Sequence, residues 1–185
     1  MPKLLVEGYV IVSAEGMLAN AHHVMPDELK FEGDKAFFTA ALDRAALIVH
    51  GRHSFEDQPN SPRRTRLIVT RTVDTIASDP SNPKATLWNP AGASFEAACD
   101  RAGIAAGTVA IIGGPAIFGM FLDRYDTFWL SQAPLVRLPD GEACFPGVPA
   151  QSPQAILAAH GMKAGDAKIL DAAHEVRVTP WSRVS

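Results

Sequence analysis

The sequence predicts an α/β fold in which one mostly parallel sheet carries helices on both faces. Runs of β-branched and other apolar residues alternate with segments of helical spacing, a pattern typical of such sheets. Two runs, Leu47-Ile48-Val49 and Leu67-Ile68-Val69, are continuously apolar, as in strands buried on both faces. The chain has 185 residues, 47% of them hydrophobic, and no segment resembles a linker, so we expect residues 1–185 to form a single domain.

Short apolar or β-branched runs mark the expected strands. These strands lie at residues 4–13, 46–50, 66–72, 86–88, 108–112 and 127–132. Near the C-terminus, residues 169–178 predict one last strand.

Four helices are expected between or after these strands. The first follows the first strand, where apolar side chains recur at helical spacing and Asp34 is placed to begin the helix. The second is expected at 94–103, between a serine N-cap and a terminating glycine. The third is expected at 115–123, because a proline costs nothing in a first helical turn, and residues 154–160 predict a fourth.

Charge and composition exclude several classes of function. Lys and Arg number 17 against 20 Asp and Glu, a net charge of −3, so nucleic acid is not expected as a partner. The longest apolar run, residues 109–122, is broken by glycines and a proline and is shorter than the roughly 20 residues that cross a bilayer. The N-terminal residues do not have the pattern of a signal peptide, so we expect no membrane association and a cytoplasmic protein.

Metal binding and disulfide formation are not expected either. Cys99 and Cys144 form no closely spaced pair, which favours buried thiols. His22 and His23 are adjacent, but no third ligand is spaced to join them.

Two glycine-containing turns follow buried strands and predict a ligand-binding cleft. Gly51-Arg52-His53-Ser54 follows one strand and Ile112-Gly113-Gly114-Pro115 ends another. Free backbone N–H groups at such turns can hold phosphates, and open α/β proteins bind ligands at the C-terminal ends of their strands. For the first turn taken alone, an ordinary turn with solvated polar residues is an equally good interpretation.

Basic residues gather near the first of these turns. Arg52, Arg63, Arg64, Arg66 and Arg71 lie within twenty residues of one another, on either side of one strand, whereas the acids are dispersed. The overall negative charge therefore conceals a local cationic stretch that fits a small anion such as a dinucleotide phosphate.

Taken in order, these segments resemble the dihydrofolate reductase family, including the pyrimidine reductases of the riboflavin pathway. Ser13-Ala14-Glu15-Gly16-Met17-Leu18-Ala19 resembles the family's S-x-D-G-x-I-A segment, and His23-Val24-Met25-Pro26 resembles the Met-Pro part of its active-site loop. The two glycine turns resemble G-R-x-T-[WY]-E and I-G-G-x-x-[IVL]-[YF], and Phe145-Pro146 resembles a late Phe-Pro pair. The resemblance covers residues 6–146 and implies a single-domain, three-layer sandwich.

The resemblance also implies NADPH as the hydride donor. Arg71, with Thr70 beside it, is expected at the 2′-phosphate, and the two glycine turns at the pyrophosphate. The residues expected at the cofactor are Gly51, Arg52, His53, Ser54, Thr70, Arg71, Ile112, Gly113, Gly114, Pro115, Ala116, Ile117 and Phe118.

On the substrate side, the resemblance implies hydride transfer to a C=N bond and one catalytic carboxylate. Asp34 is our first candidate, although without the resemblance an ordinary N-cap would be the better explanation, and Glu28 competes for the role. The residues expected at the substrate are Tyr9, Met25, Phe38, Arg64 and Ser131, with Arg64 placed for the glutamate carboxylate of a folate. Two departures are that Ser131 replaces a usual threonine and that the C-terminal segment looks unsuited to the usual closing hairpin.

The leading hypothesis is thus an NADPH-dependent reductase of dihydrofolate reductase type, with a role in one-carbon metabolism. An alternative is a reductase of 5-amino-6-ribosylaminouracil, as in riboflavin biosynthesis, or of another pterin. A third hypothesis is an NADPH-binding module without turnover. The apolar pair Phe128-Trp129 suggests a homodimer interface.

Overall fold

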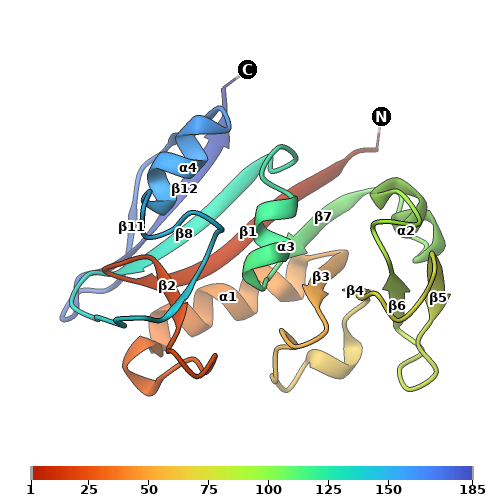
Figure 1. The fold of residues 1–185 in the computed structure, drawn as a ribbon, viewed down its shortest axis with the longest axis horizontal. Coiled ribbons are helices and arrows are strands. Elements are labelled where there is room, and N and C mark those ends of the chain that lie inside the picture. The colour runs from red at the N-terminus through yellow and green to blue at the C-terminus, as the bar shows by residue number, and fades with distance from the viewer. Residues whose placement is uncertain (1, 185) are drawn as a thin grey trace.

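A ten-stranded sheet forms the centre of the computed structural model, which describes residues 2–184 (Figure 1). In spatial order its strands are β10 (Met162–Ala164), β12 (Val176–Arg183), β8 (Thr127–Ala133), β1 (Leu4–Ser13), β7 (Gly107–Ile111), β3 (Leu47–Gly51), β4 (Arg66–Val69), β6 (Ala85–Trp88) and β5 (Ile76–Ser78), and β11 (Lys168–Asp171) pairs with β12. Strands β8, β1, β7, β3, β4 and β6 run parallel, which confirms the predicted mostly parallel sheet.

Helices cover both faces of this sheet, as predicted. Along β3, Leu47 and Val49 belong to a core cluster that includes residues of α2 (Phe95–Arg101), α3 (Pro115–Met120) and α4 (Pro153–Ala159). Ile48, between them, packs on the opposite face with Ala41 and Leu42 of α1 (Glu32–Arg44). This alternation follows from the two-residue period of a strand and produces three layers. No helix described within residues 2–184 is long and apolar enough to cross a membrane.

Helix ends follow local chemistry, with one correction. Ser94 caps α2 by accepting a hydrogen bond from the Ala97 amide at 3.1 Å, and Pro115 opens α3. Helix α1, however, begins at Glu32, and its N-cap Phe31 makes no side-chain cap. Asp34 therefore does not cap the helix, and its carboxyl is not used on backbone N–H groups.

The predicted single strand at 169–178 is wrong. The chain reverses after Asp171, whose carboxylate accepts a hydrogen bond from the His174 amide at 2.9 Å, so that β11 and β12 form an antiparallel hairpin. Strand β12 then pairs antiparallel with β8, which overturns our expectation that the C-terminal segment lacks a closing hairpin. We did not predict four short strands: β5, β10, β2 (Met17–Ala19) and β9 (Glu142–Ala143). A strand of two or three residues is too short to show an alternation of apolar and polar residues.

The first turn of α1 packs directly against the backbone of β11. A Cβ atom at Gly33 would collide with the Leu170 carbonyl oxygen, so this position admits only glycine at the observed distance between the two elements. The contact matters for the site described below, because Gly33 immediately precedes Asp34.

We predict that Gly33→Ala destabilises the protein by about 1–3 kcal/mol, because α1 and the β11–β12 hairpin must move apart. Urea unfolding of the variant checks this. Lys35→Ala, an exposed change in the same helix, should shift the free energy of unfolding by less than about 0.5 kcal/mol. Equal stability of Gly33→Ala and wild type would contradict the close contact.

Candidate functional site

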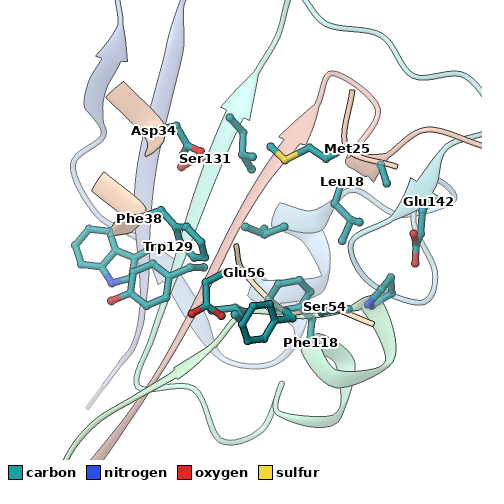
Figure 2. A pocket seen from close by; sticks show the side chains of 18 of the residues that line it. Leu18, Met25, Asp34, Phe38, Ser54, Glu56, Phe118, Trp129, Ser131 and Glu142 are labelled. Carbon is teal, nitrogen blue, oxygen red and sulfur yellow. The ribbon is translucent and has the colours of Figure 1, made fainter. Parts of the chain in front are cut away.

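A cavity of about 700 Å³ opens beside the C-terminal ends of β7 and β3, between α1, α3 and the loop that follows β3 (Figure 2). Of the site residues expected from the sequence, eleven line it: Tyr9, Met25, Asp34, Phe38, His53, Ser54, Ile112, Gly114, Pro115, Phe118 and Ser131. Its other lining residues include Leu18, His23, Phe37, Phe55, Glu56, Trp129 and Glu142. The position agrees with the expected ligand site of an open parallel sheet, where the direction of strand connection reverses around β1.

Asp34 presents its carboxyl to this cavity from the first turn of α1, next to Ser131 of β8 (Figure 2). Burial raises the pKa of Asp34 from 3.8 to about 6, and the Ser131 hydroxyl acts in the opposite direction. A carboxyl with this pKa exchanges its proton near neutral pH, so Asp34 can accept a hydrogen bond when ionised and donate a proton when neutral.

Glu28 lies elsewhere. It belongs to a short 3-10 helix, Asp27–Leu29, and borders a separate hollow of about 340 Å³ together with Asn20 and Arg137. The structure thus brings Asp34, and not Glu28, to the main cavity.

Aromatic rings form the wall of the cavity around Asp34. Tyr9, Phe37, Phe38 and Trp129 contact one another with ring centroids 5.4–6.4 Å apart. The Tyr9 hydroxyl and the Trp129 indole N–H both donate to one carboxylate oxygen of Glu7, at 3.2 Å for the indole. Burial, followed by the hydrogen bond to Glu7, raises the pKa of Tyr9 far above its ordinary value, so the phenol stays neutral.

The pair Phe128-Trp129 does not form the expected surface for a second subunit. Phe128 is fully buried among core aromatics, and Trp129 lines the cavity. The reason is the position of β8, which lies between β1 and β12 rather than at an edge. The sequence signal that could have placed Trp129 is the strand period, since it lies two residues before Ser131.

The two glycine turns contact each other through the backbone. The Gly51 amide donates to the Gly113 carbonyl at 2.8 Å, and a Cβ at Gly114 would lie 3.4 Å from the Ser54 hydroxyl. Gly113 has φ +112°, and a Cβ there would stand 2.9 Å from the Phe118 ring. A side chain is therefore excluded at Gly113, where it would collide with Phe118, and Gly114 lines the cavity beside Ser54.

The remaining residues expected at the cofactor lie outside the cavity lining. Gly51, Gly113, Ala116 and Ile117 belong to the turns themselves or to α3. Arg52 and Arg71 are exposed, and Arg71 is the second residue after the end of β4. The Thr70 hydroxyl is buried and lies 3.0 Å from that of Thr72.

A buried ion cluster of Glu56, Arg64 and Arg66 supports the loop after β3. Both terminal nitrogens of Arg66 donate to the Glu56 carboxylate, at 2.6 and 2.5 Å, and Arg64 donates to it at 3.1 Å. Arg64 also donates to Asp43 at 2.8 Å, and Arg66 stacks over the Phe55 ring at 4.3 Å. The two guanidinium groups outweigh desolvation and hold the pKa of Glu56 below its ordinary value.

This cluster corrects the placement of two arginines. Arg64, expected at a substrate carboxylate, lies outside the cavity lining with its charge engaged by Asp43 and Glu56. Arg66 is completely buried, so it does not belong to a cationic surface open to anions. Both arginines come from polar sequence that looks like surface, and only long-range pairing with Glu56 makes their burial possible.

At the mouth of the cavity, His23 and Glu142 join two separate segments. Their side chains lie 3.1 Å apart and connect the loop after β2 to β9. Within residues 2–184, no three His, Cys, Asp or Glu side chains gather as a metal ion would require.

We predict that Asp34→Asn is more stable than wild type above pH 7. The raised pKa means that the Asp34 contribution to stability is full below 3.8 and is lost as pH rises through about 6. The difference between 3.8 and about 6, at about 1.4 kcal/mol per pH unit, sets an upper limit of about 3 kcal/mol. Urea unfolding from pH 4 to 8 measures this, with the exposed Asp100→Asn as control. Parallel curves for wild type and Asp34→Asn would contradict the burial effect.

A second prediction uses the buried ion cluster. Glu56→Gln should cost about 3–5 kcal/mol, because it leaves the buried Arg66 guanidinium without a carboxylate and Arg64 with Asp43 alone. Glu96→Gln, which breaks the exposed Arg124–Glu96 pair, is the matched control and should cost less than about 1 kcal/mol. Chemical denaturation of both variants tests this, and similar losses would show that burial of the cluster does not matter.

Comparison with known proteins shows the fold. No protein-family model and no curated protein matches the chain, but solved structures do. A protein described as belonging to riboflavin biosynthesis, from Shewanella sp. PV-4, has 17% identity and a TM-score of 0.69 over 98% of this chain and 99% of its own. Dihydrofolate reductase from Enterococcus faecalis, complexed with NADP(H), has 15% identity and a TM-score of 0.64 over 98% and 97%.

A third similar structure is a diaminohydroxyphosphoribosylaminopyrimidine deaminase/5-amino-6-(5-phosphoribosylamino)uracil reductase from Thermotoga maritima. It has 13% identity and a TM-score of 0.67 over 98% of this chain and 57% of its own. The chain has the dihydrofolate reductase-like fold, as the sequence motifs predict.

Proposed function

We propose that this protein is an NADPH-dependent reductase that transfers a hydride to a C=N bond of a pterin- or folate-like substrate. The observation that carries the proposal is a single carboxyl, Asp34, with a pKa of about 6 beside an aromatic wall. Reduction of C=N leaves a nitrogen that needs one proton, and a carboxyl of this pKa can deliver it.

The glycine junction fits a dinucleotide. The two turns come together there through a backbone hydrogen bond, and the exposed Arg52 and Arg71 come from the segments that follow the neighbouring strands β3 and β4. We assign the pyrophosphate to the two turns with Ser54 and Arg52, and the 2′-phosphate to Arg71. When bound, NADPH supplies the hydride.

The chain's own residues have distinct tasks. Asp34 accepts a hydrogen bond from a ring amino group and holds the proton that the reduced nitrogen receives. Ser131 positions that carboxyl. Phe38 and Phe118 lie on α1 and α3, where their rings can hold flat heterocycles and exclude water.

A second candidate is a pyrimidine reductase of the riboflavin pathway. It is supported by the names of the Shewanella and Thermotoga proteins, whose TM-scores of 0.69 and 0.67 are both above the 0.64 of dihydrofolate reductase. The carboxyl of Asp34 serves either ring. A binding module without turnover is disfavoured, because it needs no carboxyl of raised pKa in the cavity.

The test follows loss of reduced-cofactor absorbance with NADPH and either dihydrofolate or 5-amino-6-ribosylaminouracil. We expect Asp34→Asn to lower kcat/KM by about 10²–10⁴-fold, and wild-type activity to fall as pH rises above about 6, where Asp34 loses its proton.

Glu28→Gln serves as the matched carboxylate control and should retain activity, because Glu28 borders a different hollow. Full activity of Asp34→Asn would move the catalytic role elsewhere. Tight NADPH binding without oxidation of NADPH by either substrate would favour the binding module.

A further inference from the structure

The cavity has an unusual balance of charge for a site that would take an acidic substrate. Three carboxylates line it, from Asp34, Glu56 and Glu142, together with two histidines, His23 and His53. Among residues 2–184, no lysine or arginine lines it. Away from the two glycine turns, an anionic group that entered would find Asp34, Glu142 and neutral aromatic surface around it.

The nearest buried arginines cannot supply the missing positive charge. Arg64 and Arg66 are 7% and 0% exposed, and their partners are the carboxylates of Glu56 and Asp43. The two guanidinium groups of Arg64 and Arg66 are balanced by the carboxylates of Glu56 and Asp43, so these four side chains together have no net charge. Withdrawing either arginine toward a ligand would leave Glu56 buried with less compensation, which is costly.

The mouth of the cavity adds negative charge rather than removing it. Glu142 lies there with its side chain 27% exposed, and its partner is His23, which carries charge only when protonated. The exposed Arg52, Arg63 and Arg71 lie outside the lining. A carboxylate or phosphate on the substrate that reaches this mouth would therefore meet Glu142, with no lysine or arginine among the described lining residues to pair with it.

We infer that the substrate is a flat, amino-substituted nitrogen heterocycle, and that the substituent on its ring, here called the tail, carries no carboxylate or phosphate. This inference rests on the proposed function. The heterocycle lies against the aromatic wall with its amino group at Asp34. The tail that reaches the mouth is neutral and polar, such as a hydroxylated alkyl chain or an unphosphorylated ribose. The chemistry of the tail, more than that of the ring, then separates substrates from non-substrates.

Two substrate pairs test this, each with one ring and two tails. The first pair is 7,8-dihydrobiopterin and 7,8-dihydrofolate, and the second is 5-amino-6-ribosylaminouracil and its 5′-phosphate. With NADPH and wild-type protein, we expect the neutral member of the reduced pair to have a kcat/KM about tenfold or more above the acidic member.

Equilibrium binding gives a readout that needs no turnover. Biopterin and folate, the oxidised forms, are titrated while the fluorescence of the protein is followed, since Trp129 lines the cavity. Biopterin should bind about tenfold more tightly than folate.

Variants locate the effect at the mouth. Glu142→Gln removes one negative charge and should narrow the preference for the neutral tail severalfold, and Glu142→Lys should narrow it further or reverse it. Asp100→Asn, an exposed change on α2, should leave the preference as in wild type.

The failures are distinguishable. If dihydrofolate or the 5′-phosphate is reduced as well as its neutral partner, this inference is wrong and the reductase proposal stands. If no compound is reduced but biopterin still binds more tightly than folate, the reductase proposal fails and the preference for neutral tails remains. Folate binding as tightly as biopterin, or neither binding, overturns the inference.

Discussion

The pairing of Glu56 with Arg64 and Arg66 is the constraint on which the cavity depends. Arg66 lies on β4 and is completely buried, while Glu56 comes from the loop after β3, so their two hydrogen bonds tie that loop to the sheet. The same loop carries His53, Ser54 and Phe55 to the cavity. Without the pairing, one side of the site would lack support, since few apolar contacts hold a polar loop in place.

Asp34 has different surroundings from Glu56. Its polar neighbour is the Ser131 hydroxyl, and aromatic side chains line the same cavity. Burial therefore raises the pKa of Asp34, whereas two arginines hold the pKa of Glu56 below its ordinary value. Two carboxyl groups that line one cavity thus differ in role because one is paired with arginine.

The fold is shared with proteins of only 13–17% identity, which indicates how little sequence its architecture needs. Continuous apolar runs such as Leu47-Ile48-Val49 specify buried parallel strands, and glycines at the ends of β3 and β7 permit the close approach of two turns. At this level of identity most side chains around the framework differ between these proteins. The absence of basic side chains among the described residues that line the cavity is one such local feature.

The sequence alone determined the fold class, the parallel strands, the glycine turns and the choice of Asp34 as first candidate, because each depends on local period, backbone freedom or a short motif. Tertiary structure decided that Arg64 and Arg66 are buried, that Glu28 lies apart, that Trp129 lines the cavity and that β11 and β12 form a hairpin. These facts depend on partners distant in the chain, such as Asp43 for Arg64 and Glu7 for Trp129. A charged side chain in the sequence could bind a ligand or pair with another residue of the protein. Only its burial and its partners in the folded chain decide between the two.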